Sequence, residues 1–259
     1  MRLKTRRWGS PGSESLVCIH GVSHHGGVFD GLGEHLAPRG HTVVAVDLRG
    51  HGESGREPPW NTEAHVEDLL ETIDDLGIER VTWLGHSFGG RLAAEIAARA
   101  PERAERLVLL DPGLGVSPAR ALRGAEIDRL DWNFATVDGA LNAMLSADSI
   151  FAAPEHTVEA FVRGDVRKGP DGRYRFRFCP SAAVVAWNEV SLPPPPIAEL
   201  RTLVIQAEVS IFDISEQEQR YRGAIGDRLT WVKVPKGHNV HWESPAETFA
   251  AIEAFLDSA

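Results

Sequence analysis

Cysteine and basic residues are both scarce in this chain of 259 residues. Only Cys18 and Cys179 occur, far apart in the sequence, and no Cys-x-x-Cys pair or Cys/His cluster accompanies them. Neither a disulfide framework nor a zinc site is therefore indicated. The 37 acidic residues outnumber the 27 basic ones and give a formal charge of −10, which argues against a partner that is a nucleic acid or an anionic lipid surface.

Long hydrophobic runs are absent as well. No stretch of about 18 apolar residues occurs, so no segment is expected to insert into a membrane. The basic start, MRLKTRRWGS, lacks the apolar core of a signal peptide, which makes the cytoplasm the expected compartment. The length suits one α/β unit with a large core. These features favour an enzyme that acts on a small molecule, and they leave the oligomeric state open, a homodimer included.

Strand-like and helix-like stretches alternate along the chain without internal repeats. This order predicts an α/β protein with a mostly parallel sheet covered by helices on both faces. The expected strands cover residues 2–8, 15–21, 41–50, 80–85, 106–113, 201–208 and 228–235. The expected helices cover residues 28–39, 61–77, 90–100 and 246–256.

The periodic pattern weakens between residues 113 and 197. Within this stretch, GPDGRYRFRF at 169–178 indicates a hairpin, and the run Pro193 to Pro196 indicates a stiff, extended return to the main sheet. The sequence therefore predicts a core formed by residues 1–112 and 198–259 with an insertion over 113–197.

The strongest motif is GHSFGG, in which Ser87 lies between Gly85 and Gly89. It follows an expected strand and precedes an expected helix. In such a turn backbone approaches backbone closely, so glycines fit where larger residues would clash. The sequence resembles the α/β-hydrolase family, whose nucleophile elbow has the form G-x-S-x-G, over nearly the whole chain outside the insertion. The resemblance implies Ser87 as nucleophile, a sheet of about seven strands, and a cap inserted after the strand that ends at Asp111.

Two further stretches are similar to landmarks of this family. His20 to Val22, HGV, resembles the turn that supplies one backbone N–H to the oxyanion hole, and the residue after the nucleophile supplies the other. The resemblance implies that the amides of Val22 and Phe88 hold the oxyanion. DLRGHGES, residues 47–54, resembles the next loop between a strand and a helix, and its His51 is expected to be structural.

The catalytic base is expected in KGHNVHWESPAETF. This stretch resembles the family's last loop between a strand and a helix, in which a Gly-His pair is followed five positions later by an acidic residue and then by a proline. Glu243 and Pro245 stand at those places relative to His238, so the resemblance implies His238 as the base. His241 is the competing histidine and is otherwise expected at the edge of the pocket or on the surface.

The position of the catalytic acid departs from the usual family pattern. Many relatives carry it after the strand that matches TLVIQAEVS, and that position falls on Ser210, which cannot hold an imidazolium. A subset of the family carries the acid one strand earlier, where Asp111 stands. The competing interpretation of Asp111 is an Asp-Pro turn at the start of the insertion. Glu208 and Asp213 remain as substitutes on the later strand.

The implied reaction is hydrolysis of a carboxylic ester or lactone of small to medium size. His238 would take the proton of Ser87, which attacks the carbonyl, and water would then free the acyl-enzyme. No cofactor and no metal are implied. A serine nucleophile argues against haloalkane dehalogenase and epoxide hydrolase activity, which use an aspartate in this family. Two other hypotheses stay open: a carbon–carbon bond hydrolase acting on a vinylogous diketo acid, and a non-catalytic ligand-binding protein on a hydrolase scaffold.

Substrate contacts are expected from the insertion and from the loop after the oxyanion turn. His24 and His25 either contact the substrate or lie in a solvated loop, and His241 is a further candidate. Several large apolar side chains of the insertion either line a pocket or form the core of the cap. These are Trp132, Phe134, Met144, Phe151 and Trp187.

The segment RYRFRF alternates arginines with aromatic residues. This spacing places Arg173, Arg175 and Arg177 on one face of an expected strand. Such a face is usually solvated, and the alternative is that one arginine meets a substrate carboxylate.

Overall fold

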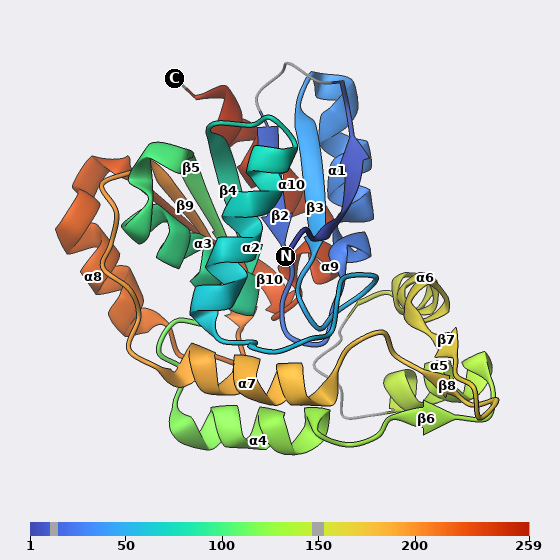
Figure 1. Ribbon diagram of the computed structural model, residues 1–259. Helices are drawn as coiled ribbons and strands as arrows, with labels where there is room; N and C mark the ends of the chain where they lie inside the picture. The colour runs from blue at the N-terminus through green and yellow to red at the C-terminus, as the bar shows by residue number, and fades with distance from the viewer. Residues whose placement is uncertain (11–14, 147–152, 259) are drawn as a thin grey trace.

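The computed structural model describes residues 1–10, 15–146 and 153–258. Its centre is a seven-stranded sheet in the order β1-β3-β2-β4-β5-β9-β10 (Figure 1). Edge strand β1 pairs antiparallel with β3, and every other pair in this sheet is parallel. The strands are β1 Lys4–Trp8, β2 Ser15–Ile19, β3 Thr42–Asp47, β4 Val81–His86, β5 Ala104–Leu110, β9 Thr202–Val209 and β10 Leu229–Gly237.

Helices cover both faces of this sheet, because alternate strand residues point to opposite sides. In β2, Val17 and Ile19 join the core that packs against α2, α3 and α8, whereas Leu16 and Cys18 join the core under α1 and α10. Figure 1 shows these two layers. The helices are η1 Gly26–Phe29, α1 Asp30–Leu36, η2 Ala37–Arg39, α2 Thr62–Asp75, α3 Phe88–Arg99, η3 Pro101–Arg103, α8 Ser215–Ile225, η4 Gly226–Arg228, α9 Val240–Glu243 and α10 Pro245–Asp257.

The segment between β5 and β9 adds no strand to the seven-stranded sheet in the described residues. Helices α4 and α7 pack side by side, and a Cβ on Gly124 would overlap the indole ring of Trp187. A three-stranded sheet of order β6-β8-β7 lies beyond them, beside α5 and α6 (Figure 1). The elements are α4 Pro118–Asp128, β6 Asn133–Phe134, α5 Val137–Ser146, α6 Glu155–Asp165, β7 Arg167–Lys168, β8 Tyr174–Arg175 and α7 Pro180–Ser191.

Hydrogen bonds fasten this segment to the large sheet at two places. Directly before α7, the Cys179 N–H donates to the Gly50 carbonyl at 2.7 Å, and the neighbouring Phe178 forms an antiparallel bridge with His51. At its end, Arg91 of α3 donates to the carbonyls of Leu192 and Pro193 at 3.0 and 3.1 Å. The start of the proline run is therefore held against the core.

The fold class predicted from the sequence is confirmed, with a mostly parallel seven-stranded sheet and helices on both faces. The hairpin expected over 169–178 is shorter than the alternating pattern suggests. Its strands are β7 and β8, and the Gly169 N–H donates to the Arg173 carbonyl at 2.7 Å across the turn. No helix among the described residues combines the length and apolar character needed to cross a membrane.

Candidate active site

Ser87 lies in the sharp turn between β4 and α3. Its φ of 54° is in the left-handed region that residues other than glycine seldom adopt, and its side chain is 5% exposed. A Cβ on Gly85 would overlap the Gly89 carbonyl, and a Cβ on Gly89 would overlap the Ile19 carbonyl of the neighbouring strand. The two glycines therefore allow the tight approach that places Ser87 at the carboxyl end of the sheet.

His238 and Asp111 are brought together from loops far apart in the chain. The Nδ1–H of His238 donates to Oδ2 of Asp111 at 2.6 Å, and Asp111 is fully buried at the end of β5. The Asp111 carboxylate also accepts the Ala207 N–H at 3.0 Å and the Ser210 hydroxyl at 2.7 Å. Two donors besides the imidazole, one on each carboxylate oxygen, therefore fix the carboxylate opposite His238.

The two alternative acids lie elsewhere. Glu208 and Asp213 are exposed, and Oδ1 of Asp213 accepts the N–H of Ser215 at 3.1 Å at the start of α8. Ser210, at the position where the resemblance to the family suggested an acid, donates its hydroxyl to Asp111. The geometry therefore favours Asp111 as the partner of His238.

The contacts of Glu243 give a physical reason for an acidic residue five positions after His238. Its carboxylate accepts the N–H groups of Gly237 and Asn239, the two neighbours of His238, each at 3.0 Å. The His238 carbonyl accepts the Nε2–H of His86 at 3.0 Å from the opposite side. The loop that carries His238 is thus held by a buried carboxylate and by an imidazole.

We expect Glu243→Gln to destabilise this loop. The amide group keeps one acceptor oxygen and turns an NH₂ toward one of the two backbone donors, so the free energy of unfolding should fall by about 1–3 kcal/mol. Urea titration of the variant checks this. Glu247→Gln, at an exposed position in α10, serves as the matched control. An unchanged urea midpoint for Glu243→Gln would contradict this role.

The amides expected to form the oxyanion hole belong to residues near Ser87, since Phe88 follows it directly and Val22 lines the same cavity. Val22 is the last residue of the HGV turn, and Phe88 is the first residue of α3; neither amide donates a hydrogen bond within the described parts of the chain. His20 supports the turn, because its Nε2 accepts the Leu48 N–H at 3.0 Å while its Nδ1–H donates to the Gly21 carbonyl at 2.7 Å. The N–H groups of Val22 and Phe88 are thus without a protein acceptor in the described residues.

A cavity of about 230 Å³ opens beside Ser87 and His238. Five further residues expected from the sequence line it: Val22, His24, Trp132, Met144 and Trp187. Trp187 donates its Nε1–H to Asp128, another lining residue, at 2.6 Å. Most of the remaining wall is apolar, so the cavity suits the hydrocarbon part of a small molecule.

Other expected contacts lie off the cavity. Phe134 packs behind the wall, with its ring centre 5.8 Å from that of Phe176. His241 is fully enclosed between His86 and Phe29 rather than at a pocket edge or on the surface, because α9 turns its ring inward. His25 is buried with its Nε2 3.7 Å from Asp165 and is not solvated. Phe151 lies outside the described residues.

Several lining residues were missed by the sequence analysis. The clearest is Asn239, which is fully buried, lines the cavity, and has a side-chain amide without a hydrogen-bond partner in the described structure. Its position directly after His238 is the signal that would have found it. The others come from turns, helix faces, the RYRFRF segment and the neighbours of motif residues: Gly21, Ser23, His86, Arg120, Gly124, Ile127, Asp128, Phe161, Phe176, Phe178 and Ile211.

Buried histidines surround this site. Desolvation is the main cause that lowers their pKa: to about 4 for His20 and to about 3 for His51, His65 and His241. The pKa values of His24 and His86 are also lowered well below the ordinary value by burial, and neighbouring histidines add repulsion. These rings are therefore neutral at pH 7 in the folded protein.

The free energy of unfolding should fall steeply as the pH is lowered. These histidines bind protons in the unfolded chain near pH 6.5 but only at much lower pH when folded, so their stabilising contribution is complete above about pH 6.5 and is lost as the pH falls toward 4. Each such group adds a slope of up to about 1.4 kcal/mol per pH unit. Urea unfolding between pH 7.5 and 4.5 measures it.

A single histidine can be isolated from this effect. We plot the free energy of unfolding against pH, where the slope reports how many protons bind on unfolding. His65→Gln should lower that number by up to one. His156→Gln, at an exposed position, is the matched control and should leave the slope unchanged. A wild-type stability that does not fall between pH 6.5 and 4.5 would refute the role given to the buried rings.

Comparison with known proteins shows the family of the chain. A family model described as alpha/beta hydrolase fold matches residues 14–143. The chain is 31% identical to Lipase LipV of Mycobacterium tuberculosis, over 98% of this chain and 97% of the relative. It is 26% identical to Esterase YbfF of Escherichia coli, over 93% of this chain and 92% of the relative.

Solved structures share the fold at low identity. The crystal structure of E-2-(Acetamidomethylene)succinate Hydrolase matches with a TM-score of 0.85 and 22% identity, over 99% of this chain and 95% of that one. The enol-lactonase from Burkholderia xenovorans matches with a TM-score of 0.78 and 22% identity, over 99% and 96%. The chain is a hydrolase that belongs to the alpha/beta hydrolase family.

Proposed function

We propose that the protein is a serine hydrolase that cleaves carboxylic esters or lactones of small to medium size. One observation carries this proposal: His238 is held by Asp111 at 2.6 Å while Ser87 and His238 line the same cavity. The lipase and esterase names of the relatives support the same class of substrate. Segment 113–197 acts as the cap, because α4 and α7 supply Gly124, Asp128 and Trp187 to the cavity wall.

The reaction follows from these positions. Nε2 of His238 takes the proton of the Ser87 hydroxyl as Oγ attacks the carbonyl carbon, and the amides of Val22 and Phe88 hold the resulting oxyanion. Asp111 keeps Nδ1 protonated and stabilises the imidazolium. His238 then gives its proton to the leaving alcohol. Water, deprotonated by the same histidine, attacks the acyl-enzyme and releases the acid.

A fluorophosphonate probe tests the nucleophile. We expect it to add one phosphonyl group to Ser87, as located by mass spectrometry of the digested protein, and to abolish turnover of p-nitrophenyl butyrate. A panel of p-nitrophenyl esters, lactones and a dienoic diketo acid then distinguishes ester hydrolysis from carbon–carbon cleavage. Cleavage of the diketo acid alone would replace the ester assignment by the carbon–carbon one. Absence of labelling and of turnover would favour the non-catalytic binding protein.

A further inference from the structure

A second, larger cavity adjoins the one beside Ser87. Its volume is about 440 Å³, and it lies between the loop after β3, which contributes Glu53 and Arg56, and the strands and turns of the proposed cap. Trp132, Phe176 and Phe178 line both cavities. The two spaces therefore share an aromatic wall.

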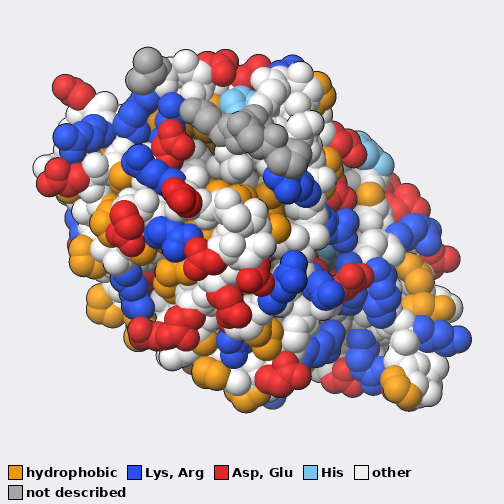
Figure 2. Space-filling view, turned by 45° about the horizontal axis from the view of Figure 1, so that its top comes forward, with side chains coloured by type: hydrophobic (Ala, Val, Ile, Leu, Met, Phe, Trp, Pro, Cys, Tyr) orange, Lys and Arg blue, Asp and Glu red, His pale blue; other side chains and the backbone are white. Residues whose placement is uncertain are grey.

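Cationic side chains dominate this second cavity. Five line it, against two carboxylates, although the whole chain carries a formal charge of −10. On the face shown in Figure 2, Lys and Arg side chains gather toward the lower right, whereas acidic and basic side chains are mixed elsewhere. A concave surface lined by one sign of charge concentrates ligands of the opposite sign.

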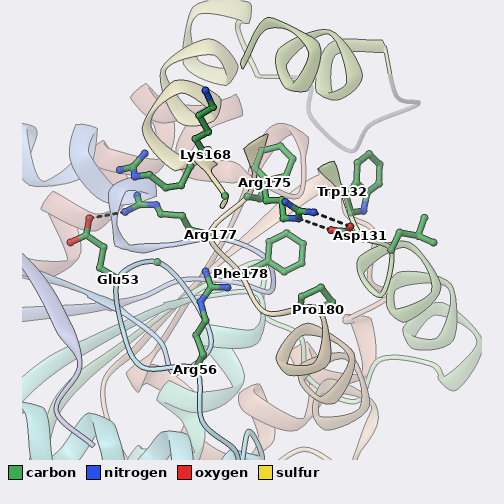
Figure 3. Close-up of a pocket in the computed structure, with 14 residues that line it drawn as sticks. Glu53, Arg56, Asp131, Trp132, Lys168, Arg175, Arg177, Phe178 and Pro180 are labelled. Carbon is green, nitrogen blue, oxygen red and sulfur yellow. Dashed lines mark hydrogen bonds and ion pairs between the residues drawn. The ribbon is translucent and has the colours of Figure 1, made fainter. Parts of the chain in front are cut away.

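Two of the five cations are already paired. Arg175 bonds to Asp131 at 3.0 Å and to Asp171 at 2.9 Å, and the buried Arg177 bonds to Glu53 at 2.9 Å. Figure 3 shows the pairs with Asp131 and Glu53. The arginines of RYRFRF therefore do not share one free face, because β8 ends at Arg175 and the chain then turns Arg177 inward.

The remaining cations have no carboxylate partner in the described residues. Arg56 rises from the core loop toward the part of the cap that carries Arg177 (Figure 3). Within the described parts of the chain Arg167 donates to the carbonyls of Gly164 and Val166, each at 3.0 Å, and the ammonium of Lys168 lies 5.9 Å from the ring centre of Tyr174. Because Asp131 and Glu53 are paired with Arg175 and Arg177, neither cavity carboxylate forms an ion pair with these three cations in the described residues.

We propose that this second cavity binds an anionic group, a carboxylate or a phosphate, at the end of the substrate whose ester lies at Ser87. This inference rests on the proposed esterase function. Arg56 and Arg167 offer guanidinium groups, whose planar donors match both anions. The shared wall of Trp132, Phe176 and Phe178 places the anionic end next to the acyl chain, so one molecule spans both spaces.

Matched substrates test the assignment. We would compare p-nitrophenyl esters whose acyl chains, of several lengths, end in a carboxylate, a phosphate monoester or a neutral methyl ester. The double variant Arg56→Gln/Arg167→Gln should raise KM for the anionic esters about tenfold while leaving kcat and all constants for the neutral ester within about twofold. Arg173→Gln is the matched control, because Arg173 lies on the same hairpin and donates to Asn133 outside this cavity.

The dependence of KM on salt concentration and on acyl chain length tests the same assignment. The wild-type KM for an anionic ester should rise between 20 and 200 mM NaCl, because Arg56 and Arg167 are exposed and their attraction is screened. The anion with the larger difference between wild type and double variant identifies the natural end group. Equal constants for anionic and neutral esters at every chain length, or an equal loss on both in the double variant, would overturn the proposal.

A binding measurement separates this inference from the esterase function. Inorganic phosphate and succinate are titrated into the wild-type protein at low salt and followed by calorimetry. Binding that weakens in the double variant and persists in Arg173→Gln supports the site even if no ester is cleaved. Absence of binding by either anion refutes the site even if neutral esters are cleaved.

Discussion

Replacing Ser87 by alanine is expected to lower kcat for ester hydrolysis on the order of 10⁶-fold, because no other group in the turn can form the acyl-enzyme. His238→Ala should cost a similar factor, since the serine hydroxyl is a weak nucleophile without its base. Single-turnover kinetics with p-nitrophenyl butyrate measures both losses. The fold should persist in Ser87→Ala, because removal of one hydroxyl leaves the glycine contacts of the turn intact.

Two controls accompany this experiment. The double variant Ser87→Ala/His238→Ala should be no slower than either single variant, because the two residues act as one unit. His241→Gln should keep most of the activity, since its ring is enclosed behind His86 rather than beside the cavity. Wild-type turnover in Ser87→Ala would refute the nucleophile, and a dead His241→Gln beside an active His238→Ala would exchange the two histidines.

Asp111→Asn is expected to lower kcat on the order of 10⁴-fold while the protein stays folded. The asparagine amide keeps the size of the carboxylate but no longer stabilises the imidazolium, and its NH₂ can face Nδ1 of His238 and favour the wrong tautomer. Turnover and melting temperature are measured together. Glu208→Gln and Asp213→Asn are the matched controls and should be nearly as active as wild type, because both side chains are exposed.

The serine that contacts Asp111 offers a more demanding test. Because the Ser210 hydroxyl lies 2.7 Å from the same carboxylate oxygen that accepts the histidine proton, an acid at 210 should reach the imidazole from the neighbouring strand. We expect Asp111→Asn/Ser210→Asp to recover at least about tenfold of the activity lost in Asp111→Asn. An Asp111→Asn enzyme with more than a tenth of wild-type activity would instead assign the acid to another residue.

The fold and two candidate catalytic residues could be predicted from the sequence because their signals are local. Ser87 lies in a turn whose two glycines are fixed by close backbone contacts, and His238 lies in a loop whose two amides need Glu243. Each signal spans only a few residues. No local signal chooses among Asp111, Glu208 and Asp213, since Asp111 and His238 are 127 positions apart and meet only when β5, β9 and β10 align.

The cavity walls could not be predicted in the same way. Phe178 reaches both cavities because Cys179 bonds to Gly50 across the interface with the core, a pairing without any pattern in the sequence. Arg177 alternates with Arg175 in sequence yet becomes buried, because the charges of Asp165 and Glu53 draw it inward. Asn239 could not be predicted as a cavity residue for a related reason. A side-chain amide points to a binding site only when it is known to be buried without a hydrogen-bond partner.

The adjacency of the ends of β5 and β9 has an evolutionary consequence. The side chains at 111 and 210 meet at one carboxylate oxygen, the one that faces His238. In this chain the acid can therefore be exchanged by two single substitutions, Ser210→Asp first and Asp111→Asn second. If the proposed mechanism holds, the intermediate with an acid at both positions keeps a carboxylate near His238 at every step.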